Sequence, residues 1–183
     1  MERRYSDIRE DDRLLAEGCR RHDRRSQDLL YRKYARKMYY VCLSYSGDKE
    51  EAKDILQEAF LKVFRNFDKY MDSGSLEGWI RRIVSNTAID HFRSSKQDRL
   101  TFSYDDILDT PEFEKPEVKM ISGTEEIIAM VRDLPKGARI IFTLFAVEGY
   151  SHKEIASKLD ISESTSKSQF RRARTLLMSK IKE

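Results

Sequence analysis

The chain has 183 residues, of which 39% are hydrophobic and 37% are charged. This balance is typical of a soluble helical protein with heavily solvated outer faces, and the length suits one ordinary domain or two small ones. The net charge is only +3, so any nucleic-acid role must come from the placement of charge and not from its total.

Cysteine content and hydropathy narrow the classes of site further. Cys19 and Cys42 fall inside helix-like patterns without the close pairing of a zinc or redox motif, and we interpret them as reduced core thiols. Cys19 and His22 form one C-x-x-H without a second half-site, so no metal site is predicted. The sequence contains no apolar run of 18 residues, and we expect a cytoplasmic protein that does not insert into a membrane.

Residues 10–96 show the three- and four-residue apolar spacing of a bundle of amphipathic helices. Asp48–Glu51 directly follows Gly47 and forms a capping box, which predicts that a new helix begins at this aspartate. Asp72–Ser75 breaks the pattern again, and Ser75 is the expected N-cap of the helix that follows.

Residues 97–122 lack this periodicity. Pro111 and Pro116 stand there among seven acidic residues, against three basic ones, and we predict a flexible acidic linker. A linker of this composition can be a solubilising spacer, or it can follow a basic protein channel by mimicking nucleic acid. Without knowledge of a partner the spacer is favoured.

Helical periodicity returns in residues 123–183. Ser151–Glu154 is a second capping box, and it precedes a short apolar stripe. After the turn Asp160–Ser162 we predict a longer helix, whose buried stripe is Ser166, Phe170, Ala173, Leu177 and Ile181. This layout is that of a DNA-binding helix-turn-helix. The expected fold is therefore all-α, with an N-terminal helical bundle and a C-terminal helix-turn-helix joined by a flexible acidic linker.

The helix-turn-helix carries a local positive charge that the whole-chain total conceals. Between Ser151 and Lys182 there are eight Lys and Arg against three acidic residues, which is the footprint of phosphate contact. A solvated helix face is the alternative interpretation. The polar side chains that lie off the buried stripe are Glu163, Ser164, Thr165, Lys167, Ser168, Arg171, Arg172 and, farther along the helix, Arg174. Those nearest the start of the helix can reach base edges in the major groove.

Three stretches of the chain carry a family resemblance. Residues 54–64, DILQEAFLKVF, and residues 78–93, GWIRRIVSNTAIDHFR, resemble the polymerase-docking helix and the promoter-melting helix of bacterial extracytoplasmic-function (ECF) sigma factors. Motifs within Gly149–Ala156 and Ser164–Arg174 resemble the domain of these factors that reads the −35 promoter element. Because the motifs occur in family order, with an acidic linker before the last, the chain is identified as a member of this family.

The resemblance implies a function for each predicted domain. Residues 10–96 would be sigma region 2, which docks on core RNA polymerase and recognises and melts the −10 element. Residues 123–183 would be sigma region 4, which recognises the −35 element. The residues expected to bind that element are Ser164, Thr165, Lys167, Ser168, Arg171, Arg172 and Arg174. Ser166 and Gln169 stand where many members have Val and Arg, which leaves the base preference open.

The expected polymerase-docking surface is a polar ridge beside the apolar stripe of the helix that begins at Asp48. In the family this ridge meets a pair of coiled-coil helices on the largest polymerase subunit. As a merely solvated face, it would leave Asp54 and Glu58 as a like-charge pair without compensation. The residues expected to bind the polymerase are Asp54, Gln57, Glu58, Leu61 and Lys62.

The expected −10 site combines the loop 67–75 with the helix that follows it. Promoter opening needs a base taken from the duplex and held by the protein, and the resemblance assigns this capture to the loop. Trp79 lies on the buried stripe, so we expect it to pack in the core and leave it out of the site. The residues expected to bind the −10 element are Asp68, Lys69, Tyr70, Ser73, Asn86, Asp90 and Arg93.

The sequence presents no catalytic arrangement, because its three histidines lie far apart in the helical layout and no phosphate-binding glycine loop occurs. We therefore expect neither an enzyme nor a cofactor nor a small-molecule substrate. The expected function is that of a sigma factor, which binds core RNA polymerase and directs transcription initiation at promoter DNA. The resemblance further implies an anti-sigma factor as inhibitory partner. The alternative is a conventional helix-turn-helix transcriptional regulator whose first block senses a ligand or dimerises.

Overall fold

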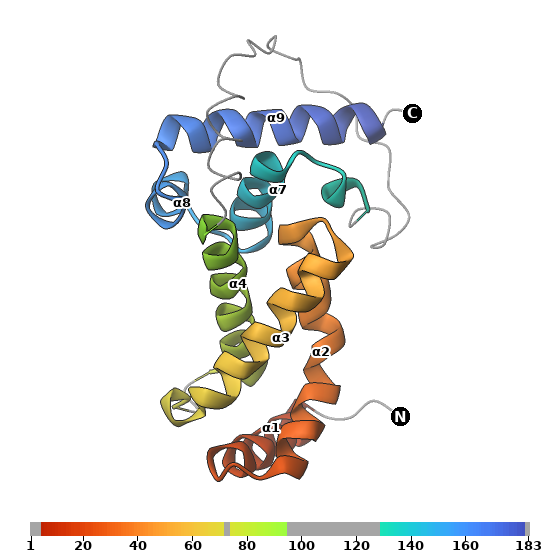
Figure 1. The fold of residues 1–183 in the computed structure, drawn as a ribbon, viewed down its shortest axis with the longest axis vertical. Coiled ribbons are helices and arrows are strands. Elements are labelled where there is room, and N and C mark those ends of the chain that lie inside the picture. The colour runs from red at the N-terminus through yellow and green to blue at the C-terminus, as the bar shows by residue number, and fades with distance from the viewer. Residues whose placement is uncertain (1–4, 72–73, 95–128, 182–183) are drawn as a thin grey trace. The chain divides into compact units, whose positions relative to one another are not determined.

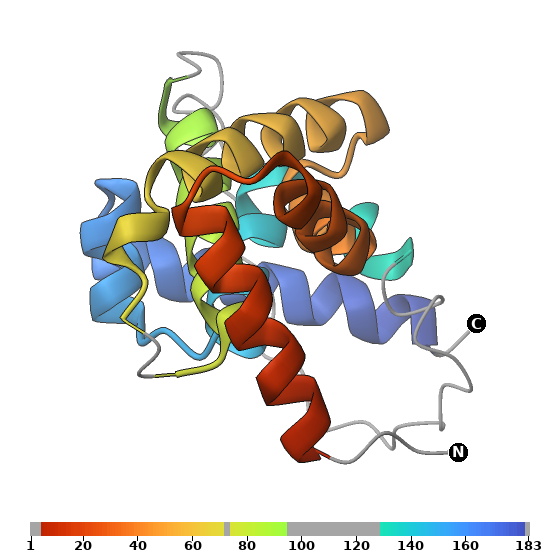
Figure 2. The same ribbon diagram turned by 90° about the horizontal axis from the view of Figure 1, so that it is seen from below.

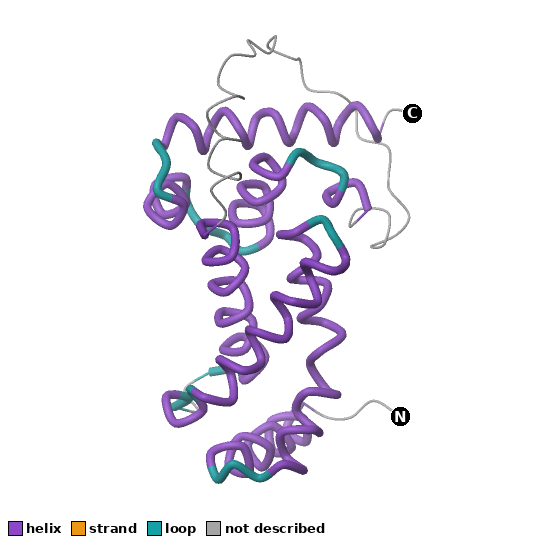
Figure 3. Tube along the Cα trace, in the orientation of Figure 1, coloured by secondary structure: helices purple, strands orange, loops and turns teal. Residues whose placement is uncertain are grey.

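The structure is a computed structural model that describes residues 5–71, 74–94 and 129–181. Within these ranges every regular element is helical (Figure 1, Figure 3), which confirms the predicted all-α class. The helices fall into two compact units, Met1–Cys42 with Lys53–Thr87 and Leu43–Ala52 with Ala88–Glu183. The acidic linker predicted at residues 97–122 lies outside the described residues.

The first unit is built from amphipathic helices whose apolar stripes face a common core. Its elements are α1 Tyr5–Arg20, α2 Arg24–Ser46, α3 Lys49–Arg65, the 3-10 turn η1 Phe67–Lys69 and α4 Leu76–Ser94. Helices α2, α3 and α4 also supply residues to the second unit. The buried apolar side chains of the first unit include Leu30, Tyr34, Met38, Ile55, Ala59, Phe60, Val63, Ile80 and Val84.

Polar contacts between side chains tie α2 to its neighbours in the first unit. Asp12 of α1 accepts hydrogen bonds from Lys33 Nζ and Tyr34 Oη, both at 2.6 Å. Lys37 Nζ of the same helix donates to Glu77 Oε2 of α4 at 2.8 Å. These contacts join specific atoms, whereas hydrophobic packing has no preferred direction. They therefore help to fix how the helices are oriented around the core.

Two helix starts predicted from the sequence are confirmed. Asp48 Oδ1 accepts hydrogen bonds from the backbone N–H groups of Glu50 and Glu51, each at 2.9 Å. Ser75 Oγ accepts one from the N–H of Gly78 at 3.3 Å. These side chains satisfy amides that have no partner within the first turn, so α3 and α4 begin directly after them.

The two cysteines are core residues, as predicted. Cys19 and Cys42 are buried and form no disulfide, and burial raises the pKa of the two thiols to about 11 and about 12. In the described ranges no three His, Cys, Asp or Glu side chains are grouped so that they could hold a metal ion. No helix in those ranges is long and apolar enough to cross a bilayer.

The second unit contains the helix-turn-helix. Its elements beyond α4 are α7 Lys136–Phe142, a π-helical turn η3 at Thr143–Val147, α8 His152–Leu159 and α9 Glu163–Ile181. Ser151 caps α8 in a complete capping box with Glu154, as predicted. The chain leaves α8 through Asp160, whose left-handed φ of 57° makes the turn toward α9. Helix α9 then lies across α7 and α8 (Figure 1).

A buried arginine within the second unit closes the end of α2. Arg139 is only 6% exposed, and it donates hydrogen bonds to the carbonyl oxygens of Tyr45 at 3.2 Å and Ser46 at 2.5 Å. It also donates to two carbonyl oxygens just before α7. Gly47 has a φ of +72°, and a Cβ there would lie 2.4 Å from Arg139 Cζ. Glycine is therefore needed both for the left-handed turn and for the space that the guanidinium occupies.

Candidate nucleic-acid and polymerase interfaces

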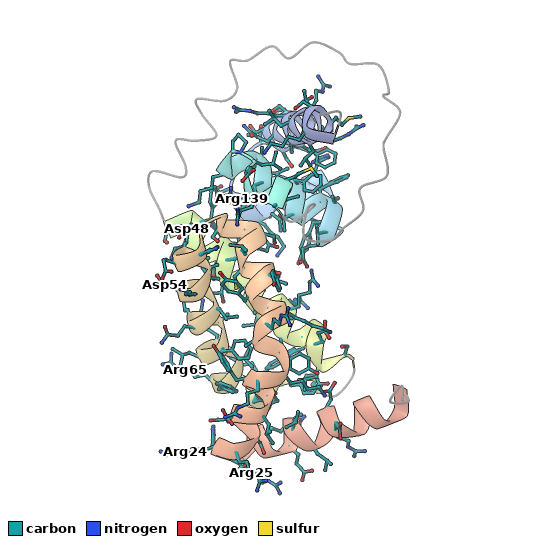
Figure 4. All side chains as sticks on the ribbon, turned by 90° about the vertical axis from the view of Figure 1, so that its right-hand side faces the viewer. Arg24, Arg25, Asp48, Asp54, Arg65 and Arg139 are labelled. Atoms are coloured by element: carbon teal, nitrogen blue, oxygen red, sulfur yellow. The ribbon has the colours of Figure 1, made fainter. Side chains whose placement is uncertain are left out.

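The polar ridge predicted on α3 lies on the outer face of that helix. Asp54, Gln57 and Glu58 are exposed, and Leu61 is 50% exposed. Figure 4 shows Asp54 pointing away from the neighbouring helices, and the apolar stripe on the opposite side of α3 is buried. An exposed leucine within a polar surface offers apolar area that a partner can cover.

An ion pair within the ridge compensates part of its negative charge. Glu58 Oε1 and Lys62 Nζ are 2.8 Å apart and form an ion pair along the helix. The like-charge pair of Asp54 and Glu58 thus has a compensating cation one turn later, and the expectation that it lacks compensation is wrong. The ridge is acceptable as a solvated surface, so its role in docking depends on the family resemblance.

The turn after α3 rests on packed aromatic rings. Phe67 and Tyr70 are 1% and 8% exposed. The ring of Trp79 packs against both, with centroids 5.1 Å from Phe67 and 5.3 Å from Tyr70. Tyr70 Oη donates a hydrogen bond to the carbonyl of Gly74 at 3.0 Å. Trp79 is half-buried, so it packs on these rings as predicted but does not belong to the fully buried core, and the three rings form an aromatic base for the turn.

The residues predicted for this turn occupy different environments. Asp68 and Lys69 are exposed, whereas the side chain of Tyr70 belongs to the aromatic base. Met71 is 84% exposed and is absent from the predicted set, although its place directly after a run of aromatic residues signals a loop tip. Ser73 lies outside the described residues.

The remaining residues predicted for the −10 element share one face of α4. Asn86, Asp90 and Arg93 are all exposed, and their spacing of four and three residues aligns them along the helix. Phe92, on the other side of the helix, is 3% exposed. The outer face of α4 thus presents an amide, a carboxylate and a guanidinium, which are groups that can contact base edges and phosphates.

The start of the recognition helix α9 is held by a serine cap. Ser162 Oγ accepts a hydrogen bond from the N–H of Thr165 at 2.9 Å. Lys167 Nζ lies 2.7 Å from Glu163 Oε1, and this exposed pair is weak enough for DNA to displace it. Of the predicted −35 residues, Thr165 and Arg172 are half-buried, and the exposed ones are Ser164, Lys167, Ser168, Arg171 and Arg174.

The two departures from the family pattern lie inside the protein. Ser166 and Gln169 are 0% and 1% exposed, so neither side chain reaches the surface of the protein. Ser166 Oγ lies 2.9 Å from His152 Nδ1 of α8, and Gln169 Oε1 has no hydrogen-bond partner among the described residues. The departures therefore affect how α9 packs, and their effect on base preference stays a prediction.

His152 links the two helices of the helix-turn-helix. Its ring stacks on Phe145, with centroids 4.4 Å apart and an interplanar angle of 17°. Burial, followed by the nearby cation of Lys167, lowers the pKa of His152. The neutral imidazole is therefore the form that the packed α8–α9 pair favours.

Comparisons with known proteins agree with this arrangement of elements. The family model for Sigma-70 region 2 matches residues 30–98, a range that contains α3, the aromatic turn and α4. The family model for Sigma-70, region 4 matches residues 124–177, a range that contains the turn of the helix-turn-helix and most of α9.

Similar proteins match along nearly the whole chain. The RNA polymerase sigma-H factor of Pseudomonas aeruginosa is 30% identical over 177 residues, which cover 90% of this chain and 91% of that protein. The ECF RNA polymerase sigma-E factor of Escherichia coli strain K12 is 29% identical over 184 residues, covering 93% and 94%. The structure of CnrH in complex with the cytosolic domain of CnrY has a TM-score of 0.50 at 20% identity, covering 94% of this chain and 97% of that chain. This last likeness concerns the fold alone.

Proposed function

Since this chain belongs to the extracytoplasmic-function (ECF) family of RNA polymerase sigma factors, we propose that three surfaces divide its work: the ridge on α3, the aromatic turn with the outer face of α4, and the recognition helix α9. The protein binds RNA polymerase and promoter DNA as a non-catalytic initiation factor. The region 2 match over residues 30–98 distinguishes it from a conventional helix-turn-helix regulator.

Polymerase docking is assigned to the ridge on α3. Its members are Asp54, Gln57, Glu58, Leu61 and Lys62. Their support is that they stand on the outer face of a helix whose other face is already packed, so a partner helix can lie along them without disturbing the core. Leu61 supplies apolar area, and the charges around it set register and exclude wrong partners.

Recognition of the −10 element is assigned to the aromatic turn and α4. The packed rings beneath the turn fix its backbone, which reduces the entropy lost when a flipped base is captured. Asp68 and Lys69 stand exposed beside this rigid base, with Tyr70 as part of its support and Ser73 in the rest of the loop. Asn86, Asp90 and Arg93 then approach DNA near the start of melting.

Recognition of the −35 element is assigned to α9. Ser164, Lys167 and Ser168 lie nearest the exposed start of the helix and are placed to read base edges, while Arg171, Arg172 and Arg174 follow as phosphate contacts. Thr165 Oγ1 lies 2.7 Å from Ser162 Oγ, so its part is to hold the start of the helix in place.

The domain plan and the regulation follow from the same assignment. Residues 10–96 serve as region 2, residues 97–122 as the acidic linker and residues 123–183 as region 4. An anti-sigma factor that covers the docking and DNA-binding surfaces would keep the protein inactive, and the family resemblance supports such a partner. The protein acts in the cytoplasm, where it meets the polymerase.

The observation that carries this proposal is that the region 2 match precedes the region 4 match, and that the two matched ranges contain the three exposed surfaces. The test is to mix the protein with core RNA polymerase and genomic DNA and to map the transcripts. We expect specific starts that share a −10 and a −35 element and that core polymerase alone does not produce. Unspecific transcription, or DNA binding that needs a palindrome and no polymerase, would contradict it.

A further inference from the structure

The end of α2 and the start of α3 lie in the same compact unit as the helix-turn-helix. This unit joins Leu43–Ala52 to Ala88–Glu183, although the first of these segments falls within the region 2 match and most of the second within or beyond the region 4 match. In both views α7 lies beside the turn between α2 and α3 (Figure 1, Figure 2). The contacts made there belong to none of the three surfaces assigned above, so they need a separate explanation.

The last turn of α2 receives its hydrogen bonds from α7 and η3. The final four carbonyl oxygens of a helix have no partner inside that helix, and α2 ends at Ser46. Thr143 Oγ1 donates to the carbonyl of Ser44 at 3.1 Å. Arg139 donates to those of Tyr45 and Ser46 at 3.2 Å and 2.5 Å. Because α2 has no basic residue in its own last turn, Arg139 also supplies the cation that the negative end of the helix favours.

Arg139 can leave α2 without losing all of its partners. Its Nη1 donates to the carbonyl oxygens of Arg132 and Leu134, both at 2.7 Å, and these two residues belong to the same region 4 match as Arg139. A buried guanidinium needs hydrogen bonds to offset the water it has lost. If α7 moved away from α2, two of these bonds would remain and water would replace the others. Arg139 therefore has two satisfactory arrangements, of which only one joins the two regions.

An ion pair holds the start of α7 to the first turn of α3. Lys136 Nζ lies 3.1 Å from Glu51 Oε1, and the two side chains are 25% and 23% exposed. The same ammonium lies 5.9 Å from the centre of the Phe92 ring. Partial burial makes such a pair stronger than one on the open surface. Glu51 stands one turn before Asp54, where the docking ridge begins, so α7 is attached directly next to that ridge.

These contacts are incompatible with simultaneous binding of both promoter elements. On straight duplex DNA the −10 and −35 elements are about 25 base pairs apart, which is about 85 Å. Helix α3 leads from the contacts to the aromatic turn, and its 17 residues are about 25 Å long. A domain of the size of region 4 is about 30 Å across. At any angle between the two units, the turn and α9 are therefore kept within about 55 Å of each other.

We propose that the contacts of Arg139, Thr143 and Lys136 with the end of α2 and with Glu51 form a latch, which holds the free protein in an inactive form. Binding of core RNA polymerase and promoter DNA separates region 4 from α2 and opens the latch. This inference rests on the proposed assignment of −10 and −35 recognition to the two regions. A protein whose competent form is a minor one binds its partners more weakly by the fraction that is open. The latch is thus a brake within the chain itself.

The test needs a variant that opens the latch and leaves each region intact. Asparagine tolerates the left-handed φ of Gly47, but its Cβ would lie 2.4 Å from Arg139 Cζ, so Gly47→Asn displaces the guanidinium. The matched control is Gly149→Asn, because Gly149 has a similar φ of +77° and a Cβ there meets nothing within 4 Å. A second latch-breaking variant is Lys136→Glu, which repels Glu51. Its charge-swapped partner, Lys136→Glu/Glu51→Lys, restores the ion pair.

Spin labels measure the latch in the full-length protein without any partner. The labels are placed by Lys49→Cys and Ser157→Cys, at two exposed positions within the second unit. Cys19 and Cys42 are buried and react slowly with the label. We expect one short, narrow distance for the parent, the control and the charge-swapped variant, and longer, broader distances for the two latch-breaking variants. With core polymerase and promoter DNA, every variant should show the same longer distance.

Affinity measurements show whether the latch restrains the protein. The promoter is one found by the transcription assay above. The latch-breaking variants should half-saturate the complex with core polymerase and this promoter at a protein concentration at least about tenfold lower than the parent, because the minor form of a two-state protein is commonly below about 10%. The control and the charge-swapped variant should match the parent. Affinity for an isolated −35 duplex should not change in any variant, because the exposed face of α9 takes no part in the latch.

Other outcomes overturn the inference in different ways. A broad distance distribution in the free parent means that the latch does not form. A short distance that persists in the complex with polymerase and promoter means that the contact is permanent. If both latch-breaking variants half-saturate that complex at the parental concentration, the contact does not restrain the protein. If the parent gives no specific starts, the proposed function fails and the inference fails with it, whereas failure of the inference alone leaves those starts in place.

Discussion

We assign a partner-facing surface to each of α3 and α9, but the two helices are held in place by different chemistry. On α3 the inner face is apolar, with Ile55 and Val63 at 2% and 0% exposure. On α9 the fully buried residues include Ser166 and Gln169, at 0% and 1% exposure, beside Ala173, while its larger apolar side chains, Phe170, Leu176 and Leu177, pack only partly buried. Burying an aliphatic side chain stabilises a fold by about 1.5–3 kcal/mol, whereas a buried hydroxyl or amide must find a hydrogen bond merely to avoid a cost.

The difference shows what each helix can tolerate. The ridge on α3 can change without disturbing the core, because its residues take no part in packing. The face of α9 depends on a polar contact between Ser166 and His152, so the helix that reads DNA is seated by groups that respond to mutation and to protons. We therefore expect that substitutions on the ridge of α3 change binding without changing stability, whereas substitutions on α9 more often change both.

The largest expected effect compares the two inner faces directly. Ile55→Ala should lower the free energy of unfolding by about 2–5 kcal/mol, because it leaves a cavity in the core. Ser166→Ala should lower it by only about 0.5–1.5 kcal/mol, the net contribution of one hydrogen bond. Urea titration checks both values, with the fluorescence of the single tryptophan, Trp79, as reporter for the first unit and circular dichroism for the whole chain. Equal losses in the free energy of unfolding would mean that the inner faces of α3 and α9 stabilise the protein to the same extent.

The next effect separates binding from folding on α3. Asp54→Ala/Gln57→Ala should weaken binding to core polymerase by about 1–2 kcal/mol or more, as expected for central interface residues. The free energy of unfolding should stay within about 0.5 kcal/mol of the parent, because both side chains lie off the apolar stripe. Fluorescence anisotropy with core polymerase and urea titration measure the two quantities. Undiminished polymerase binding would mean that the docking ridge is wrongly placed.

The elements of both units could be predicted from the sequence because local rules determine them. Asp48, Ser75 and Ser151 cap helices at the predicted positions, since capping depends on residues within one turn. The apolar spacing likewise predicted the buried face of α3 and the exposed face of α4. These features require no knowledge of what a helix packs against.

Contacts between distant segments could not be predicted in the same way. The sequence places Tyr70 in a loop, but only the packed rings of Phe67 and Trp79 show that it supports the turn. Gln169 has the polarity of a surface residue, and its burial depends on what lies against α9. The buried contacts of Arg139 could not be predicted either, because its carbonyl partners on α2 lie more than 90 positions away in the chain.

A smaller effect should divide α9 along its length. Substituting Ser164, Lys167 or Ser168 should change which −35 sequence is preferred, because the start of the helix is nearest the base edges. Arg174→Ala should weaken binding about equally across sequences and reduce the salt slope by about 0.9, the value for one phosphate contact on duplex DNA. Salt titrations on a matched and a scrambled −35 duplex measure both effects. If Lys167→Ala weakened binding to all sequences equally while Arg174→Ala changed the base preference, the far end of α9, and not its start, would lie nearest the base edges.

The smallest effect concerns the protonation of His152, the residue that contacts Ser166 on the inner face of α9. Because the folded protein lowers the pKa of His152 below its usual 6.5, the unfolded chain binds more protons than the folded one as the pH falls below that value. The stability that depends on neutral His152 is therefore complete above about pH 6.5 and is lost as the pH falls through the lowered folded pKa. The same change should not occur on α3, whose inner face contains no titratable side chain.

Urea titrations at pH 7 and pH 5 test this dependence, with His152→Gln as the matched variant. Glutamine keeps a polar side chain near Ser166 but takes up no proton, so the variant should lose less stability between the two pH values than the parent. Lys167→Ala should move the pKa of His152 back toward its usual value, because it removes the cation that helps to lower it. Proton NMR of the imidazole measures that shift, and a His152 pKa at or above 6.5 in the folded parent would show that α9 is not seated on a neutral histidine.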